Sequence, residues 1–272
     1  MNNSPIGIFD SGMGGLTVMR ALMRALPHES FVYLGDTARL PYGTKSADTV
    51  ERYAVQAAGA LMRRDVKLIV VACNTASAVA LPALEKALAP IPVIGVVEPG
   101  AEAAVAAAQG ETIAVIGTEG TIKGGAYLRA IRARAADAEI VQQACPLFVP
   151  LAEEGLIDGE IAELVAERYL APVFAAAKPK ALVLGCTHFP VLVPMLEKVI
   201  VRLGGDAMLV DSAATTAEAV SRRLSQNGLA QSTSAAPSYT FLATDAPERF
   251  ARVGKIFLGR APQDVDLVDL AQ

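Results

Sequence analysis

Short apolar runs alternate along this chain with longer segments that have helical spacing. Segments such as LTVMRALMRAL and ADTVERYAVQAAGALMRR place apolar residues three and four positions apart, as one face of a helix requires. Alternation of this kind predicts an α/β fold with mostly parallel sheets covered by helices. The runs that we expect to form strands are residues 6–9, 31–34, 68–72, 93–97, 113–116, 181–184 and 208–210.

The pattern of the first half of the chain returns in the second half. VVACNT and VLGCTH end similar runs on Cys73 and Cys186, which lie 113 positions apart, and the runs that begin at Ile6 and Ile113 lie 107 positions apart. These offsets nearly agree, and VVEPGAEAAVAAAQGETIAV has the character of a crossing between the halves. We therefore expect two pseudosymmetric α/β domains that each contribute one thiol to a shared cleft.

Polar groups stand at or just past the ends of the apolar runs. In a parallel sheet, functional groups gather at the carboxyl ends of the strands. Any buried strand must be followed by a polar residue, but six such residues in one chain favour a site at this edge. The six are Asp10, Asp36, Cys73, Glu98, Cys186 and Asp211.

The thiols of Cys73 and Cys186 fit a chemical role better than the thiol of Cys145. Cys145, in QQACPLFVPL, fits a small buried hydrophobe. Cys73 and Cys186 are each followed by polar groups where a strand passes into a helix, and we expect this position to lower the pKa of both thiols. Because the chain has no CxxC pair, we expect all three thiols to be free.

The residues that follow Cys73 and Cys186 argue against two familiar classes of cysteine enzyme. A cysteine phosphatase needs an arginine six residues after its nucleophile, but Val79 and Leu192 stand at those positions. A Cys/His hydrolase needs a histidine against its nucleophile. His188 lies only two residues after Cys186, and such a hydrolase leaves Cys73 unexplained.

Two equivalent thiols suit the inversion of a carbon that carries a proton. One base removes the proton from one face while an acid delivers another to the opposite face, and a thiol can serve in both roles because its pKa can be brought near the working pH. Pyridoxal phosphate would need a lysine at the same edge, but Lys67 and Lys180 precede their strands. There is no carboxylate cluster for a metal ion. We therefore expect neither a cofactor nor a metal.

Two turn-rich stretches follow the first two strands. The turn in FDSGMGGLTVMRAL points backbone N–H groups outward, so a carboxylate or a phosphate could bind there. As a dinucleotide fingerprint it fails where Thr17 replaces the last glycine, and Asp10 would repel a pyrophosphate, although Asp36 lies where a ribose-binding acid would. The second stretch, LGDTARLPYGTKS, is expected to form a pocket wall.

Composition excludes several classes of partner. A formal net charge of −4, spread without basic blocks and with few aromatic residues, argues against a nucleic-acid surface. No apolar stretch approaches the roughly 20 residues of a membrane span, and MNNSPIGIFD lacks the features of a secretory signal. We expect a soluble, cytoplasmic protein that acts on a small molecule.

Eight stretches of the chain together carry a family resemblance. They are GIFDSGMGGLTV, YLGDTARLPYG, VVACNTASA, GVVEPGA, VIGTEGTI, PLFVPLAEEG, LGCTHFP and LVDSA. In this order they resemble the bacterial glutamate racemases, the cofactor-independent enzymes that supply D-glutamate for peptidoglycan. The resemblance implies a glutamate substrate, a homodimer and a C-terminal segment that returns to the first domain. That domain would comprise residues 1–97 and 211–272, and the second would comprise residues 98–210.

The resemblance also implies roles for single residues. Cys73 and Cys186 match the family's catalytic thiols, and Asp10, Glu153 and His188 match the acid and base groups that assist them. Asp10 and His188 would also contact the substrate. The other residues that match those holding the amino acid are Ser11, Tyr42, Gly43, Asn74, Thr75, Thr121 and Thr187.

Three features depart from the family pattern. Gly124 stands in TIKGGAY where a serine is expected, and Phe189 replaces a tyrosine, so both are expected at a pocket wall or a dimer surface. The chain begins five residues before its first expected strand. Activation by a peptidoglycan precursor, which goes with an N-terminal extension in this family, is therefore not expected.

Two alternatives stay open from the sequence. An aspartate racemase shares the two-cysteine plan, and the size of the pocket cannot be read from the residues. A racemase-like protein that binds DNA gyrase belongs to a different class. The retention of both thiols and of the polar strand-end groups favours the enzyme.

Overall fold

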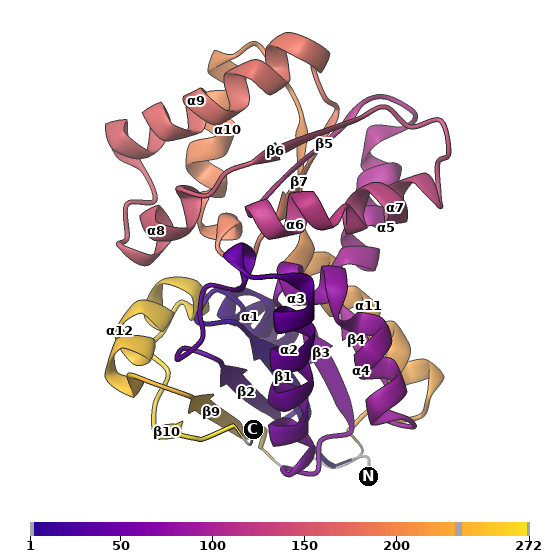
Figure 1. Ribbon diagram of the computed structural model, residues 1–272, viewed down its shortest axis with the longest axis vertical. Helices are drawn as coiled ribbons and strands as arrows, with labels where there is room; N and C mark the ends of the chain where they lie inside the picture. The colour runs from indigo at the N-terminus through magenta and orange to yellow at the C-terminus, as the bar shows by residue number, and fades with distance from the viewer. Residues whose placement is uncertain (1–2, 232–235, 271–272) are drawn as a thin grey trace.

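Two lobes, each built around one sheet, make up the molecule (Figure 1). The computed structural model describes residues 3–231 and 236–270. The strand order is β10-β9-β2-β1-β3-β4 in the first sheet and β6-β5-β7-β8 in the second. Every strand pairing among the described residues is parallel. The predicted α/β class is confirmed.

The strands of the first sheet come from both ends of the chain, whereas those of the second come from its middle. The first sheet contains β1 (Ile6–Asp10), β2 (Phe31–Gly35), β3 (Leu68–Val71), β4 (Val93–Gly95), β9 (Tyr239–Ala243) and β10 (Val265–Leu267). The second sheet contains β5 (Ile113–Gly117), β6 (Ile140–Ala144), β7 (Ala181–Gly185) and β8 (Met208–Asp211).

Helices cover both faces of each sheet. On the first sheet, α1 (Leu16–Ala25), α11 (Ser212–Gln226) and α12 (Pro247–Leu258) pack on one face, while α2 (Ala47–Met62), α3 (Asn74–Val79) and α4 (Leu81–Leu88) pack on the other. On the second sheet, α8 (Phe148–Glu153), α9 (Gly159–Ala177) and α10 (Val193–Arg202) oppose α5 (Val97–Ala108) and α7 (Ala126–Arg132). The remaining elements, α6 (Glu119–Gly124) and the short 3₁₀ turns η1 (Tyr42–Thr44) and η2 (Phe189–Leu192), lie near the junction of the lobes.

The internal repeat predicted from the sequence is present in the topology. The order β2-β1-β3-β4 recurs as β6-β5-β7-β8, with each strand replaced by the one four places later in the chain. Cys73 follows β3 and Cys186 follows β7, so the two thiols occupy equivalent positions in the two lobes. The first sheet differs only in gaining β9 and β10 at one edge.

The segments at the proposed domain boundaries change lobes. β4 belongs to the first sheet, and α5, which begins at Val97, packs against α7 and β7 of the second lobe. β8 ends the second sheet at Asp211, and α11 then returns to pack against α1. Division of the chain at 97/98 and 210/211 remains a proposal that this arrangement supports.

All seven predicted strands are present, but the strand expected at residues 93–97 is shorter in the structure. The strand ends at Gly95, and Val97 already belongs to α5, where burial in the core of the second lobe accounts for its apolar character. The prediction missed β6, β9 and β10. β6 carries two glutamines and is half-buried at a sheet edge, and β10 has three residues, so neither has a long apolar run.

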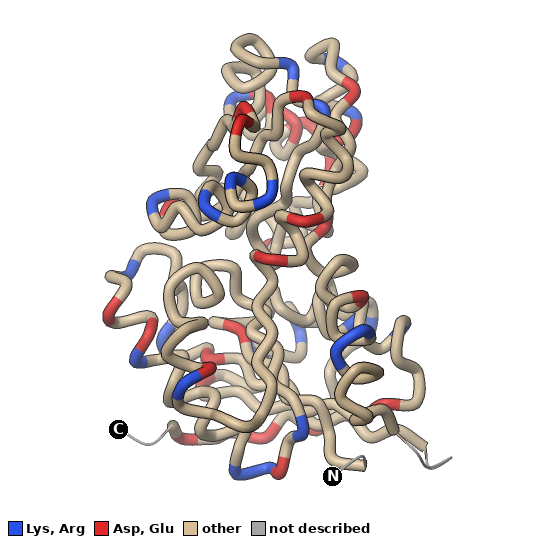
Figure 2. The backbone as a smooth tube through the Cα atoms, turned by 90° about the vertical axis from the view of Figure 1, so that its right-hand side faces the viewer, with Lys and Arg blue, Asp and Glu red and all other residues tan. Residues whose placement is uncertain are grey.

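The described part of the chain, residues 3–231 and 236–270, contains no helix long and apolar enough to cross a membrane. Figure 2 shows Lys and Arg interspersed with Asp and Glu over both lobes.

Candidate active site

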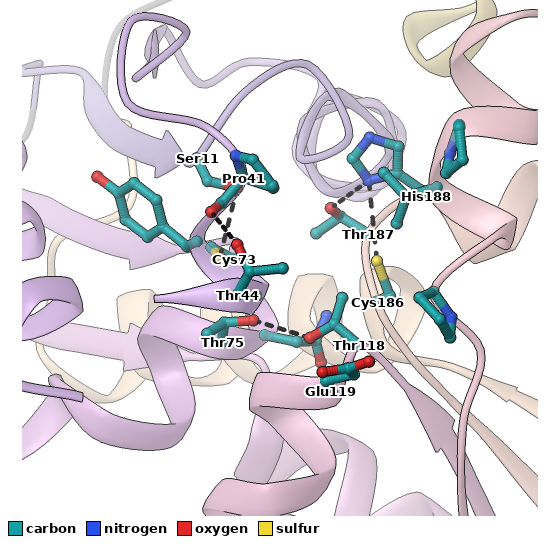
Figure 3. A pocket seen from close by; sticks show the side chains of 16 residues that line it. Ser11, Pro41, Thr44, Cys73, Thr75, Thr118, Glu119, Cys186, Thr187 and His188 are labelled. Carbon is teal, nitrogen blue, oxygen red and sulfur yellow. Dashed lines mark hydrogen bonds between the residues drawn. The ribbon is translucent and has the colours of Figure 1, made fainter. Parts of the chain in front are cut away.

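A cavity at the junction of the lobes is lined by residues from both of them (Figure 3). The two strand-end thiols, Cys73 and Cys186, both line it. From the first lobe come Ser11, Pro41, Tyr42, Gly43, Thr44, Cys73, Asn74 and Thr75. From the second come Thr118, Glu119, Pro146, Val149, Pro150, Cys186, Thr187 and His188.

Most of the residues singled out from the sequence lie in this lining. Among the residues matched to catalysis or substrate binding, the exceptions are Asp10, Thr121 and Glu153. Thr121 contacts Thr75 and Thr118 through its hydroxyl, and Glu153 pairs with His188. Asp10 acts on Cys73 through its charge. Sequence reasoning assigned no role to Thr118, Glu119, Pro146, Val149 or Pro150. The three residues 146, 149 and 150 follow β6, a strand that the sequence pattern did not reveal.

Cys73 lies at the point where β3 passes into α3 and is 6 % exposed. Its Sγ accepts a hydrogen bond from the Ala76 N–H at 3.5 Å and donates one to Ser11 Oγ at 3.7 Å. Burial, reinforced by the negative charge of Asp10, raises the pKa of the Cys73 thiol to about 12. The expectation of a lowered pKa was therefore wrong for Cys73, because one N–H donor does not compensate for the loss of water.

Asp10 ends β1 and lies behind the cavity wall, where it is 1 % exposed. Its Oδ2 accepts a hydrogen bond from the Gly12 N–H at 3.0 Å, while Oδ1 has no hydrogen-bond partner among the described residues. Burial raises the pKa of this carboxyl, although the His188 charge and nearby backbone N–H groups oppose the effect. Asp10 is therefore an electrostatic neighbour of both Cys73 and His188.

On the opposite side, His188 links Cys186 to a chain of charged groups. Its Nδ1 lies 3.8 Å from Cys186 Sγ, and its Nε2 lies 3.1 Å from Glu153 Oε1. Glu153 Oε2 accepts a hydrogen bond from Arg249 Nη2 at 2.9 Å, and Arg249 stands on α12 of the first lobe. The ring of His188 also packs edge-on against Phe257 of α12, with ring centroids 4.9 Å apart.

These contacts keep His188 positively charged. Burial alone would lower the pKa of His188, but hydrogen bonds with Cys186 and Glu153 and the negative charges of Cys186 and Asp10 outweigh it and raise the pKa to about 10. Burial likewise favours the neutral form of Glu153, yet His188 and Arg249 hold the pKa of that carboxyl below its usual value. The arrangement places an imidazolium beside the Cys186 sulfur.

The raised pKa of His188 makes stability depend on pH. An unfolded histidine has a pKa of about 6.5, so the stability that the His188 proton contributes is complete below that pH and is lost as pH rises towards 10. Between about pH 7 and 8.5, we expect the free energy of unfolding of the wild type to fall more steeply than that of His188→Asn. The difference in slope should approach about 1.4 kcal/mol per pH unit. Urea unfolding at a series of pH values measures this, and parallel slopes would show that folding adds no net proton to the pair of His188 and Cys186.

The glycine-rich turn after β1 brings the lobes together. A Cβ on Gly14 would lie 2.3 Å from His188 Nδ1, and one on Gly15 would lie 2.5 Å from the Cβ of Asp10. Thr17 Oγ1 donates a hydrogen bond across the junction to the Thr187 carbonyl at 2.9 Å. The Thr187 and His188 segment therefore occupies the space beside Gly14, while Ser11 at the start of the turn lines the cavity and stays available to a carboxylate.

The second turn-rich stretch forms a wall of the cavity, as predicted, but not with the hydroxyl of Tyr42. That hydroxyl donates to Asp36 Oδ2, while Asp36 Oδ1 accepts from Thr244 Oγ1 at 3.0 Å. Burial, together with the Asp36 charge, raises the pKa of Tyr42 well above its usual value. Asp36 therefore holds Tyr42, and with it this wall of the cavity, without lining the cavity itself.

Two of the six strand-end polar groups serve the framework instead of the cavity. Glu98 lies in the first turn of α5 with its side chain 55 % exposed and pairs with Arg134 at 2.7 Å. Asp211 Oδ1 accepts a hydrogen bond from the Ala213 N–H at 2.8 Å and so caps α11. Expecting all six at one site overlooked the capping role that carboxylates commonly play where a helix begins.

Three threonine hydroxyls join the lobes along another side of the cavity. Thr75 of α3 lies 3.1 Å from the Thr118 hydroxyl and 3.3 Å from that of Thr121, and the latter two are 3.0 Å apart. A Cβ on Gly43 would lie 2.9 Å from Thr118 Cβ, so η1 can approach α6 only because residue 43 is glycine. Thr121 supports Thr75 and Thr118 and is itself 1 % exposed.

The two departures from the family pattern do not alter the lining. Phe189 is fully buried and packs edge-on against Phe148 in the core of the second lobe, with centroids 5.2 Å apart. Gly124 ends α6 and is not among the residues that line the cavity. The expectation that Phe189 touches a pocket wall or a dimer surface was therefore wrong, because its ring fills a hydrophobic core.

All three cysteines are free thiols, as predicted, and Cys145 is fully buried in the second lobe. Burial raises its pKa, which agrees with the inert role expected from the sequence. In the described residues, no three His, Cys, Asp or Glu side chains are grouped as metal ligands would be.

Comparisons with known proteins match most of this chain. The model of the family described as Asp/Glu/Hydantoin racemase matches residues 6–220. A glutamate racemase from Geobacter metallireducens is 50% identical over 265 residues, which cover 97% of this chain and 96% of that protein. The crystal structure of glutamate racemase from Francisella tularensis in complex with D-glutamate has a TM-score of 0.92 at 39% identity and covers 99% of both chains.

A more distant likeness extends to the fold alone. An aspartate racemase from Picrophilus torridus has a TM-score of 0.56 at 18% identity, over 82% of this chain and 94% of that one.

Proposed function

Because this chain belongs to the Asp/Glu/hydantoin racemase family and is an amino-acid isomerase, we propose that it interconverts L- and D-glutamate without a cofactor. The proton would move at the α-carbon between the substrate and two thiols. The observation that carries the proposal is the placement of Cys73 and Cys186 at equivalent strand ends of two repeated lobes, on one cavity. Pseudosymmetric lobes can present two equivalent groups to opposite faces of one small molecule.

The two thiols would work in opposite protonation states. Cys73, with its pKa raised to about 12, is a proton donor, while the imidazolium 3.8 Å from Cys186 Sγ stabilises a negative charge there. For one enantiomer, the Cys186 thiolate takes the α-proton and becomes a thiol, and Cys73 gives its proton to the opposite face and becomes a thiolate. The resulting state acts on the other enantiomer, so protons and charges balance without an oxidant or a metal.

Asp10, His188 and Glu153 would set these protonation states. The negative charge of Asp10 favours the proton on Cys73, and the positively charged His188 ring lies 3.8 Å from Cys186 Sγ, where it stabilises negative charge during the transfer. Glu153 holds the imidazolium through Nε2 and is held in turn by Arg249. Each thiol therefore has its own charged neighbour.

The other lining residues would bind the amino acid. As the α-proton leaves, negative charge spreads onto the α-carboxylate, and hydrogen-bond donors placed around it stabilise that charge. Such donors are carried in the lining by the side chains of Ser11, Asn74, Thr75 and Thr187. Gly43 contributes only backbone atoms to the lining. Thr121 would act by holding Thr75.

We expect Asp10→Asn and His188→Asn to lower kcat by about a hundredfold while changing KM severalfold at most, because each charge acts on a proton transfer. The losses in kcat should differ between the L-to-D and D-to-L directions, since the two charges flank different thiols. The enantiomers have equal free energies in water, so kcat/KM must stay equal in both directions and KM must absorb the difference. Initial rates by circular dichroism from each enantiomer measure this. An unchanged kcat with a raised KM would argue that Asp10 and His188 serve only to bind substrate.

Circular dichroism of L-glutamate incubated with the purified protein and no added cofactor tests the function itself. Decay of the signal to zero supports glutamate racemisation. A parallel incubation with L-aspartate tests the alternative of an aspartate racemase, which the family model allows but which the likeness to glutamate racemases over nearly the whole chain disfavours. An unchanged signal for both amino acids would refute the proposal.

In the cell, we infer that a cytoplasmic homodimer supplies D-glutamate for peptidoglycan, as the resemblance to glutamate racemases implies. Binding to DNA gyrase is the alternative function. Both catalytic thiols and their charged neighbours are retained, which an inactive binding protein would not need. Nucleic acid is not expected as a partner, since the chain carries a formal net charge of −4 with both signs interspersed over its lobes (Figure 2).

A further inference from the structure

Tyr127 makes a buried hydrogen bond across the junction of the lobes to a residue of the cavity. It lies on α7 of the second lobe and is 1 % exposed. Its hydroxyl donates to Asn74 Oδ1 at 2.7 Å. Asn74 is the first residue of α3, directly follows Cys73 and lines the cavity. Tyr127 itself is not among the lining residues and belongs to none of the roles described above.

The ring of Tyr127 is held in place by packing. A Cβ on Gly100 of α5 would lie 3.2 Å from the ring and hydroxyl of Tyr127, and one on Gly185 at the end of β7 would lie 3.2 Å from another ring atom. Two glycines therefore admit the ring, which then has close neighbours from both elements. Because a tyrosine with a fixed ring keeps its hydroxyl oxygen in one place, the donor reaches Asn74 without further ordering.

This donor decides which end of the Asn74 amide is available. The two ends of an amide have nearly the same shape, but the oxygen accepts hydrogen bonds and the nitrogen donates them. Since Tyr127 donates to Oδ1 and so fixes the orientation of the amide, Nδ2 is the end that remains to donate to a ligand. Asn74 is 3 % exposed, and its Nδ2 has no hydrogen-bond partner among the described residues. A buried donor without a partner favours binding of a ligand that supplies an acceptor.

We propose that Tyr127 is a positioning residue that orients the Asn74 amide so that Nδ2 donates to a carboxylate oxygen of the substrate. The inference rests on the proposed function, in which the substrate is an amino acid with two carboxylates. The opposite orientation would face the amide oxygen toward the carboxylate and repel it. Because Tyr127 and Asn74 belong to different lobes, the first lobe recognises the carboxylate only while the second lobe is packed against it.

The test is a double-mutant cycle on KM, with kcat followed in parallel. Tyr127→Phe keeps the ring and removes the donor, and we expect it to raise KM for both enantiomers by about tenfold and to change kcat less. In the background of Asn74→Ala, the same change at Tyr127 should alter KM by less than about twofold, because Tyr127 acts through the amide. Tyr239→Phe is the matched control, since Tyr239 stacks on Phe31 in the first sheet and is not among the lining residues.

A second variant covers the case in which Tyr127→Phe folds poorly. In Asn74→Asp, both side-chain oxygens are acceptors, so Tyr127 can still donate to one while the other repels a carboxylate. We therefore expect KM to rise further in Asn74→Asp than in Asn74→Ala. An unchanged KM in Tyr127→Phe, an equal effect of that change with and without Asn74, or a smaller effect of Asn74→Asp than of Asn74→Ala would each overturn the proposal.

Failure of this inference is distinguishable from failure of the proposed function. The cycle can equally be run on dissociation constants for L- and D-glutamate measured by calorimetry. A wild type that binds glutamate but does not racemise it refutes the proposed reaction, and the cycle on dissociation constants then still decides the role of Tyr127. A racemising wild type with an additive cycle refutes the role of Tyr127 alone.

Discussion

Replacing either Cys73 or Cys186 with alanine is expected to lower kcat for glutamate racemisation by about a thousandfold or more, with the folded structure retained. Each thiol serves one face of the α-carbon, and a single base cannot both remove a proton from one face and deliver one to the other. General acid–base groups commonly contribute factors of about 10² to 10⁴ to rate. Serine at either position should be nearly as damaging, because an alcohol is a far weaker acid than a thiol.

Cys145→Ala is the control for these variants. Cys145 is equally a buried thiol of the second lobe, but it is not among the residues that line the cavity. It should keep kcat close to that of the wild type, although removal of a buried side chain costs some stability. Racemisation of L- and D-glutamate is followed by circular dichroism for all variants. Near-normal turnover by Cys73→Ala or Cys186→Ala would exclude the two-thiol mechanism.

The framework of the site could be predicted from the sequence because it depends on local patterns. Apolar runs of the right length mark the strands, parallel sheets gather the ends of strands at one edge, and a repeated VVACNT and VLGCTH pattern locates the two thiols. Burial of these runs depends little on distant residues. The repeat predicts two similar lobes, and the order of strands common to both sheets agrees with it.

What could not be predicted depends on contacts between distant residues. The partner of Glu153 is Arg249, 96 residues away on α12, and the partner of Asn74 is Tyr127, 53 residues away on α7. No local sequence pattern predicts either pair. The predicted direction of the pKa shift at Cys73 was wrong for the same reason. Tertiary burial and the charge of Asp10 set that shift, rather than the place of Cys73 at the start of α3.

Racemisation in deuterated water should place deuterium in the product and leave the recovered starting enantiomer largely unlabelled early in the reaction. The donor thiol exchanges with solvent before substrate binds and carries deuterium, whereas the thiol formed by abstraction carries the original hydrogen of the substrate. Cys73 and Cys186 are 6 % and 5 % exposed, so bound substrate closing the cavity leaves little water to exchange the abstracted hydrogen. Reversal of the first step therefore returns hydrogen, and only completed turnover delivers deuterium.

A single-base mechanism would not give labelled product together with unlabelled starting enantiomer. In that mechanism one group takes the hydrogen and returns whatever isotope the solvent has supplied. Proton NMR of the α-position, with the two enantiomers resolved after short incubations, distinguishes the mechanisms. Starting from L- and from D-glutamate in turn tests both thiols as the abstracting base.

The alanine variants test each thiol separately. With one thiol removed, the surviving base can abstract the α-proton of only the enantiomer that faces it, and most reversals return that hydrogen. Over long incubations, the slow exchange of the surviving thiol with solvent should make Cys73→Ala and Cys186→Ala label opposite enantiomers without interconverting them. Substantial early label in recovered substrate with the wild type, or labelling of the same enantiomer by both variants, would show that the two strand-end thiols are not the acid and base on opposite faces of the α-carbon.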